Sequence, residues 1–388
     1  MARALARRQL KRRLEAAAYR LLRLLVSWAF RRRQPHPAPR RFLLVLRGQR
    51  YGDAVVSLAF SAALRQRFPE AVIWALGPPM LQAVLACDRN LAGFLPLPDP
   101  EWRHPVETLR GLLRVRRLGA DLAFALGIHF RTCLLARLAA GYGIGYDYNG
   151  RGFVLDQALA PHLSCNRSGW EYDAGSNPPH ITRFWARLLD QPMVAESEPS
   201  WTGLDLGPHQ ARAAAFLAEH LPGPSPLVLV HPWASSAIRT WPAHHLQELL
   251  SRAAAGTDWR LVVSGGPEHA ARAAELVELA PGRLAAAAGR LTLAETWALL
   301  RQASAVVSVD TVVIHMAAAV NVPVISLFGP GDPLVWGPWG QLDRVLQPHA
   351  QCRRCKRATC LHPGLPCMEA IQPELVLERV RALIAGCG

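Results

Sequence analysis

The sequence predicts an α/β protein with two doubly wound, Rossmann-like domains that face a central cleft. Three observations predict this fold. Apolar strand-length segments alternate with helical ones in the first half of the chain, the same alternation restarts in the second half, and a polar stretch broken by Pro and Gly over 191–207 separates the two halves as a hinge. A length of 388 residues with 51% apolar residues is typical of two folded domains and excludes a chain that is disordered throughout.

The first half follows a Pro-rich linker at Gln34–Arg40. Its apolar periodicity predicts alternating elements, namely strands at Phe42–Leu46, Ala71–Leu76 and Leu122–Leu126 and helices at Asp53–Arg67, Val106–Leu118 and Thr132–Ala140. Residues 147–178 are rich in Gly, Asn, Pro and aromatic residues, so we expect loops and short strands there. A helix at Ile181–Leu189 then precedes the hinge.

The second half repeats the pattern. We expect strands at Leu227–Val230, Trp259–Val263, Ala305–Val309 and Val324–Phe328, and helices at Ala243–Ala255, His269–Leu279, Leu293–Gln302, Ile314–Val320 and Pro373–Ile384. Parallel strands need such helical crossovers, and ligands of open parallel sheets bind at the carboxyl ends of the strands. The loops that follow these strands are therefore where we look for chemistry.

Most of the net charge of +15 lies at the N-terminus, since residues 1–33 carry 11 basic residues and one acidic residue. An apolar helical stripe runs through this segment, formed by Leu10, Leu14, Leu21, Leu25 and Trp28. A basic amphipathic helix suits an anionic membrane surface; the alternatives are a helix packed on the body and a nucleic-acid-binding arm. Three arginines follow the apolar stretch instead of a cleavage site, which argues against a signal peptide. No nucleic-acid-binding module follows, so we expect no nucleic-acid partner.

Asp53 follows the first strand and a Gly-containing loop. An Asp at a helix start caps free N–H groups, which is the plain structural interpretation. The functional interpretation is a carboxylate at the carboxyl end of a strand, where it could take a proton from an attacking hydroxyl. The loop lacks the G-x-G-x-x-G pattern of dinucleotide-binding proteins.

The strand-to-helix crossing over 230–242 carries Ser235, Ser236 and Arg239. Two hydroxyls and a guanidinium suit a phosphate, although ordinary turn chemistry would also explain them. A second crossing carries Asp310 and Thr311, with His315 near the first turn of the following helix. Asp310 would repel a diphosphate, so we expect it to cap the helix or to accept a hydrogen bond from a sugar hydroxyl.

Four cysteines lie close together near the C-terminus, at Cys352, Cys355, Cys360 and Cys367. Four thiolates at this spacing could hold Zn²⁺ or iron as a structural site. Free thiols, or disulfides in an oxidising compartment, are the alternatives. The chain has no G-x-x-x-x-G-K-[ST] loop, which makes a P-loop ATPase improbable.

Together these stretches resemble glycosyltransferase family 9, the ADP-heptose lipopolysaccharide heptosyltransferases, from about Arg41 to the C-terminus. The run SVDTVVIHMAAAVNVPVISLFGPGDP over 308–333 is similar to the family signature, and RGQRYGDAVVS over 47–57 to its N-terminal loop. The stretch HPWASSAIRTWP over 231–242 looks like its phosphate-contacting loop, with Arg239 at the place of a Lys. Two residues depart from the pattern: Val312 replaces the usual Gly, and Gly331 stands where Thr is common.

The resemblance implies a GT-B fold with four parts. These are a basic helix and linker at 1–40, an acceptor-binding domain at 41–205, a nucleotide-sugar-binding domain at 206–345, and a Cys-rich segment with a C-terminal helix at 346–388 that crosses back toward the first domain. It implies inverting transfer of a sugar, heptose from ADP-heptose, to a hydroxyl of a lipopolysaccharide core or a related lipid-linked glycan, without a catalytic cofactor. The alternatives are a protein heptosyltransferase with a Cys-bound metal and a non-catalytic nucleotide-binding homologue.

The resemblance also assigns roles to residues. Asp53 is the expected general base, and the expected nucleotide-sugar-binding residues are Ser235, Ser236, Arg239, Glu268, Asp310, Thr311 and His315. An enzyme of this kind would be cytoplasmic and peripheral on the bacterial inner membrane, held on the anionic surface by residues 1–33.

Overall fold

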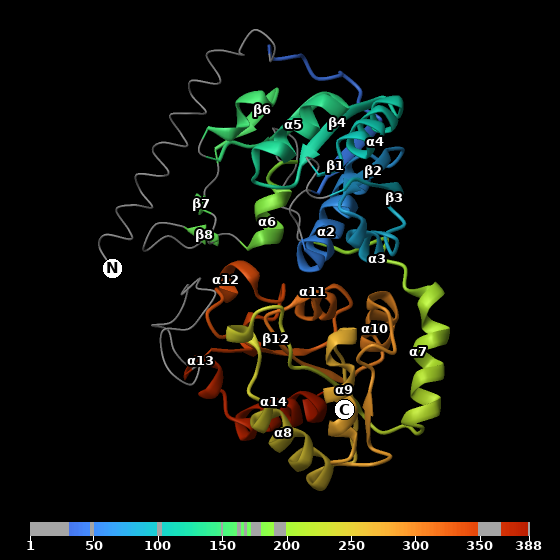
Figure 1. The fold of residues 1–388 in the computed structure, drawn as a ribbon, viewed down its shortest axis with the longest axis vertical. Helices are drawn as coiled ribbons and strands as arrows, with labels where there is room; N and C mark the ends of the chain where they lie inside the picture. The colour runs from blue at the N-terminus through green and yellow to red at the C-terminus, as the bar shows by residue number, and fades with distance from the viewer. Residues whose placement is uncertain are drawn as a thin grey trace, which may run out of the picture. The chain divides into compact units, whose positions relative to one another are not determined.

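The computed structural model describes residues 31–46, 50–98, 103–148, 150–160, 164–166, 169–171, 180–189, 199–347 and 366–386 (Figure 1). The chain divides into two compact units. The first holds residues 1–178 and 182–203, and the second holds 179–181 and 204–388. Within the described residues, no helix has both the length and the apolar character needed to cross a bilayer.

The first unit is built on a six-stranded parallel sheet of order β3-β2-β1-β4-β5-β6. Its strands are β1 (Arg41–Val45), β2 (Val72–Gly77), β3 (Leu91–Pro96), β4 (Ala120–Ala125), β5 (Ala140–Tyr146) and β6 (Gln157–Leu159). The helices are α2 (Tyr51–Arg67), α3 (Gln82–Leu85), α4 (Pro105–Arg117), α5 (Phe130–Ala139) and α6 (Ile181–Ala186), the last of which begins at the boundary between the units. A short antiparallel hairpin joins β7 (Ser164–Asn166) and β8 (Gly169–Glu171).

Alternate residues of β1 pack on opposite faces of this sheet, as the pleat of a strand requires. Phe42 stacks with Phe124, whose ring meets Phe60 of α2 edge-on. Leu43 belongs instead to a core cluster with Cys133 of α5. Both faces are thus covered by helices, which explains why the strand reads as a continuous apolar run.

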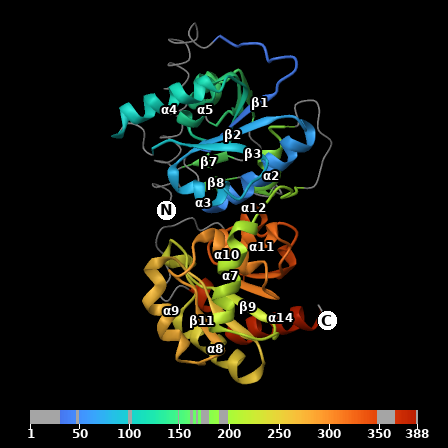
Figure 2. The ribbon, with the colours of Figure 1, turned by 90° about the vertical axis from the view of Figure 1, so that its right-hand side faces the viewer.

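The second unit repeats this design with a parallel sheet of order β11-β10-β9-β12-β13-β14 (Figure 2). Its strands are β9 (Leu227–His231), β10 (Arg260–Val263), β11 (Leu284–Ala286), β12 (Ala305–Val309), β13 (Val324–Leu327) and β14 (Val345–Leu346). Its helices are α7 (Gly207–His220), α8 (Ala243–Gly256), α9 (Ala270–Val277), α10 (Leu293–Leu300), α11 (Val312–Ala319), α12 (Pro333–Trp336), α13 (Pro366–Glu369) and α14 (Pro373–Gly386).

Each expected strand and helix is present in the structure, with ends shifted by a few residues. Helix α2, for example, begins at Tyr51 rather than Asp53, so Asp53 is the third residue of the helix. The expectation that the C-terminal helix crosses to the first domain is wrong. Val376 and Val380 of α14 belong to the same core cluster as Leu249 of α8 and Val307 of β12, so the helix covers its own unit's sheet.

The chain that enters the first unit is held at Arg33. Its guanidinium and backbone N–H bind the fully buried Asp156 carboxylate at 2.9 and 2.8 Å, and its Nη1 donates to the carbonyl of Ala140 at 2.9 Å. The chain that leaves the unit is held at Trp201, whose indole N–H donates to the carbonyl of Val55 at 2.9 Å. Both ends of the unit are therefore fixed by side-chain hydrogen bonds to its core elements.

Candidate active site

The loops after β9, β10 and β12 emerge at one edge of the second sheet, because parallel strands direct their carboxyl ends to the same side. Strand order places β9 between β10 and β12. These three loops carry six of the residues expected to bind the nucleotide-sugar, namely Ser235, Ser236, Arg239, Glu268, Asp310 and Thr311. The topology thus gathers residues that are far apart in the sequence.

Arg239 is the centre of the contacts between two of these loops. It is the last residue of a short 3-10 helix, Ala237–Arg239. The N–H of Arg239 donates to the carbonyl of Ser236, the residue before this helix. Its Nη1 donates to the carbonyl and to the carboxylate of Asp310 at 3.1 and 3.3 Å, and its Nη2 donates to Ser235 Oγ at 3.1 Å. Ser235 is exposed and the guanidinium is 30% exposed, so both can reach a ligand.

Of the two roles expected for Asp310, capping of the following helix is wrong. Thr311 is the N-cap of α11, and its hydroxyl accepts the N–H of Val313 at 3.3 Å. The Asp310 carboxylate turns to Arg239 instead. Burial raises the pKa of the Asp310 carboxyl, and the neighbouring guanidinium acts in the opposite direction.

Gly331 makes this arrangement sterically possible. A Cβ at this position would lie 2.7 Å from Asp310 Oδ2 and 3.1 Å from the ring of Phe328, both of which are closer than Cβ atoms normally approach. Gly331 is one of the two departures from the family pattern, where Thr is common. The space that a threonine would need is taken here by the carboxylate that holds Arg239.

A half-buried histidine, His231, ends β9 at the same edge of the sheet, and the sequence did not indicate it. His231 Nδ1 lies 3.0 Å from Ser264 Oγ, which follows β10. Burial lowers the pKa of His231 to about 4, so the imidazole is neutral near pH 7. Nearby, the rings of Trp233 and His269 stack with centroids 4.6 Å apart. His231 begins the stretch HPWASS, but nothing in a single sequence shows which side chain will face it.

His315 lies in α11 and is 6% exposed. Burial lowers its pKa to about 3, with a smaller contribution from His180 in the same direction. His180 is also buried and donates from Nε2 to the carbonyl of Gly337 at 2.8 Å. No pattern in the sequence indicates His180, because it lies in a stretch without periodicity. The His315 imidazole is therefore a neutral hydrogen-bonding group near pH 7 rather than a cation.

Glu268 follows β10 and has a side chain that is 69% exposed. Its carboxylate lies 3.4 Å from His269 Nδ1 and lines a pocket between α8 and α9 with Gln247 and Arg272. An exposed carboxylate beside this sheet edge remains available to hydroxyl groups of a ligand.

Asp53 belongs to the first unit, at the third position of α2. Its Oδ2 accepts the backbone N–H of Arg50 at 2.9 Å, which is the helix-capping role that the sequence left open. The residue is half-buried, and this burial raises the pKa of its carboxyl. The Asp53 side chain thus has a structural role at the start of α2.

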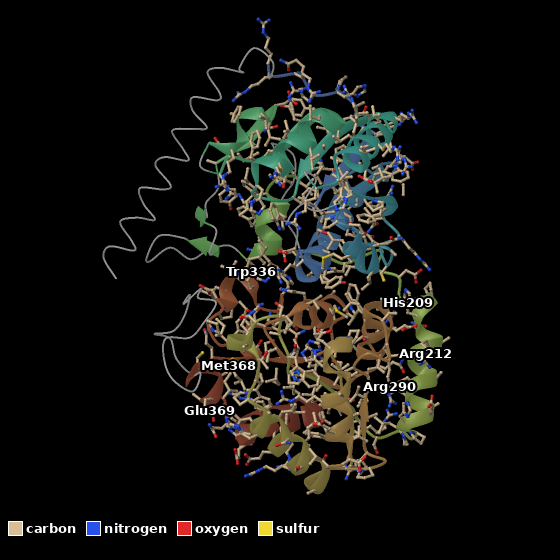
Figure 3. The ribbon with its side chains drawn as sticks, viewed as in Figure 1. His209, Arg212, Arg290, Trp336, Met368 and Glu369 are labelled. Atoms are coloured by element: carbon tan, nitrogen blue, oxygen red, sulfur yellow. The ribbon has the colours of Figure 1, made fainter. Side chains whose placement is uncertain are left out.

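Of the four clustered cysteines, Cys352, Cys355 and Cys360 lie outside the described residues. Cys367 is buried on the short helix α13, beside Met368 and Glu369, which Figure 3 labels. Its Sγ lies against Gly329, where a Cβ would come within 3.2 Å of it. The described part of this cluster is therefore a thiol packed beneath the loop that follows β13.

Comparison with known proteins gives a consistent result. The model of a family described as glycosyltransferase family 9 (heptosyltransferase) matches residues 110–365. Lipopolysaccharide heptosyltransferase 1 of Pseudomonas aeruginosa is 35% identical over 316 residues, which covers 80% of this chain and 81% of that protein. Lipopolysaccharide heptosyltransferase 2 of Escherichia coli K12 is 25% identical over 366 residues, covering 88% of this chain and 98% of that protein.

Solved structures show the same fold. The E. coli ADP-heptose lps heptosyltransferase II matches with a TM-score of 0.68 at 19% identity, over 89% of this chain and 99% of that one. The E. coli heptosyltransferase WaaC with ADP-2-deoxy-2-fluoro heptose matches with a TM-score of 0.64 at 18% identity, over 88% and 99%. The expected GT-B fold is confirmed, and the molecule is an enzyme of the glycosyltransferase class. More narrowly, the chain belongs to glycosyltransferase family 9.

Proposed function

We propose that this chain transfers heptose from ADP-heptose to a hydroxyl of a lipid-linked lipopolysaccharide core, with inversion at the anomeric carbon. The curated relatives are named lipopolysaccharide heptosyltransferases, and a structural neighbour binds an ADP-heptose analogue. The observation that carries the proposal is the Arg239 guanidinium, which donates hydrogen bonds to both Ser235 and Asp310. It lies at the edge of the sheet where parallel sheets bind ligands.

The donor's diphosphate would lie against Arg239, Ser235 and Ser236, and against the N-terminal N–H groups of the helix that Thr311 caps. A guanidinium, hydroxyls and a helix N-terminus each stabilise negative charge, and that charge grows on the diphosphate as it departs. Asp310 keeps the guanidinium oriented before the donor arrives. Glu268 would accept hydrogen bonds from the nucleoside.

His315 would contact the sugar or a phosphate as a neutral group. Its pKa of about 3 means that it can donate or accept a hydrogen bond but supplies no positive charge near pH 7. Charge stabilisation therefore depends on Arg239 and on oriented N–H and O–H groups, not on histidine.

Asp53 would act as the general base. The acceptor oxygen attacks the anomeric carbon as the bond from that carbon to the phosphate oxygen breaks, and the hydroxyl proton moves to the Asp53 carboxylate. ADP leaves with the bonding electron pair. A raised pKa makes a carboxylate a stronger base, which suits this role.

The donor is tested by thermal unfolding of the full chain with ADP-heptose, ADP, and UDP- and GDP-sugars. A ligand at 100 times its Kd adds about 2.7 kcal/mol to stability, so ADP and ADP-heptose should raise the Tm clearly. A preference for UDP or GDP compounds would overturn the donor assignment.

The two chemical roles are tested by paired variants. Asp53→Asn should abolish transfer and leave ADP affinity within about twofold. Asp121 is the control, because its carboxylate also accepts backbone N–H groups in the first unit, and Asp121→Asn should stay active. Arg239→Ala should weaken ADP binding about 10- to 100-fold, as loss of charge-assisted hydrogen bonds does, and the exposed Arg301→Ala should not. Transfer by the Asp53→Asn variant would remove Asp53 as the base.

A further inference from the structure

Helix α4 presents an apolar stripe to solvent. Val106, Leu109 and Leu113 are 54, 58 and 49% exposed, and they are the three most exposed large apolar side chains among the described residues. Their spacing of three and then four residues places them on one side of the helix. Figure 2 shows α4 at the rim of the first unit. Single exposed apolar residues are ordinary, but three in a row on one helix need an explanation.

The stripe is not the core-facing side of the helix. Val115 is fully buried and packs in the first unit's core cluster, with the half-buried Leu112 against it. Gly111 lies against Leu97, where a Cβ would come within 2.7 Å of the leucine side chain. At 100° per residue, the three stripe residues lie about 120–180° from Val115, so the core fixes the stripe in its outward orientation.

Arginines border the stripe. Arg110, Arg114, Arg116 and Arg117 are exposed, whereas Glu107 is the one acidic residue of the helix. At 100° per residue, Arg116 lies on one side of the stripe, and Arg110 and Arg117 lie on the other. Within the described parts of the chain, no carboxylate forms an ion pair with any of these four guanidinium groups.

We propose that α4 docks onto an anionic lipid surface, with the stripe at the acyl boundary and the arginines on lipid phosphates. A protein partner is less suitable, because the core of a protein interface is depleted in charge while exposed arginines border this stripe on both sides. The flexible stems of arginine can lie along an apolar surface while their head groups reach the phosphates. This surface is separate from residues 1–33 and does not depend on which sugar the enzyme transfers.

Hydrogen exchange of the full chain with and without vesicles tests the docking. Vesicles of phosphatidylglycerol and phosphatidylethanolamine should slow exchange of the amides over 105–117, and phosphatidylcholine vesicles should not. The variant Leu109→Ser/Leu113→Ser should lose this protection, and its vesicle partition coefficient should fall several-fold. The matched control Leu342→Ser/Leu375→Ser changes similarly exposed leucines of the second unit and should behave as wild type.

Residues 1–33 are present in every variant, so any binding through them is common to all of the variants compared. Unchanged exchange over 105–117 with anionic vesicles would overturn the proposal, as would protection that survives in the Leu109→Ser/Leu113→Ser variant. Protection that appears without vesicles and rises with protein concentration would also overturn it, because a second copy of the chain would then cover the stripe. Because Leu109 and Leu113 face solvent, the Leu109→Ser/Leu113→Ser variant should have a Tm within about 2 °C of wild type. A loss of protection in this variant would then reflect lost docking and not misfolding.

Discussion

Asp156 is a fully buried carboxylate whose loss should destabilise the first unit strongly. It accepts hydrogen bonds from Arg33 and from the N–H of Gly143, at 2.9 Å, and its Oδ2 lies 3.5 Å from Nη1 of Arg137. The change Asp156→Ala leaves Arg137, which is 9% exposed, as a buried cation without its carboxylate. Removing one partner of a buried ion pair costs about 3–5 kcal/mol, which for a unit of this size lowers the Tm by roughly 6–20 °C.

The measurement is thermal and urea unfolding followed by circular dichroism. Asp121→Ala is the matched control, because Asp121 also accepts two backbone N–H groups, from Arg40 and Arg41, but lies at an exposed site. We expect the control to lose less than about 1 kcal/mol. If Asp156→Ala is no less stable than Asp121→Ala, the buried ion pairs of Asp156 do not contribute the stability expected of them.

Two further predictions concern the second unit. Because His231 and His315 have pKa values lowered to about 4 and 3, the unfolded chain binds protons that the folded unit does not. The stability of this unit should therefore fall as the pH drops below about 6.5 and continue to fall toward 4; a urea midpoint that stays constant from pH 7 to 4.5 would contradict this. Gly331→Ala should displace the Asp310 carboxylate and cost about 1–3 kcal/mol by overpacking, with weaker ADP binding, whereas Gly386→Ala, which has open space around it, should be neutral. Equal Tm and ADP affinity in the two glycine variants would show that the space beside Asp310 is not needed.

The sequence predicted the sheets well where strands are buried on both faces. Strand β12 was placed at its observed ends, because AVVSV is fully buried and the short apolar run has no other interpretation. Strand β5 was missed because its sequence AGYGIGY is rich in glycine, which signals turns when read locally. The structure gives the reason for two of those glycines: a Cβ at Gly143 would meet the Arg137 backbone, and one at Gly145 would meet Ala125.

Elements with weak local signals were also missed. Strand β11 has the sequence LAA and β14 has two residues, so neither is long enough to show a period. Helix α7 begins at Gly207, which is the last residue of the predicted hinge, and Pro208 lies in its first turn. Tertiary packing decides such segments, and a single sequence does not contain it.

For the candidate site, the sequence identified residues that follow strands, but not the contacts between them. Ser235, Arg239 and Asp310 were found because each lies at a strand-to-helix crossing. The orientation of Asp310 toward Arg239 depends on β9 and β12 being neighbours, which is a property of strand order. The pairing of His231 with Ser264 depends in the same way on β9 and β10.

The structure links the departure at Gly331 with a second feature of the sequence, the arginine at position 239. Arg239 replaces a Lys, and its planar fork reaches the carbonyl and the carboxylate of Asp310 while the other nitrogen reaches Ser235. A lysine ammonium is a single point of charge and could not hold all three oxygens in this geometry. Because the fork fixes the carboxylate, the carboxylate occupies the space beside residue 331, and only glycine fits there. Arg239→Lys should therefore reduce the penalty of Gly331→Thr in a double-mutant cycle measured by ADP affinity, and additive effects would show that the two positions vary independently.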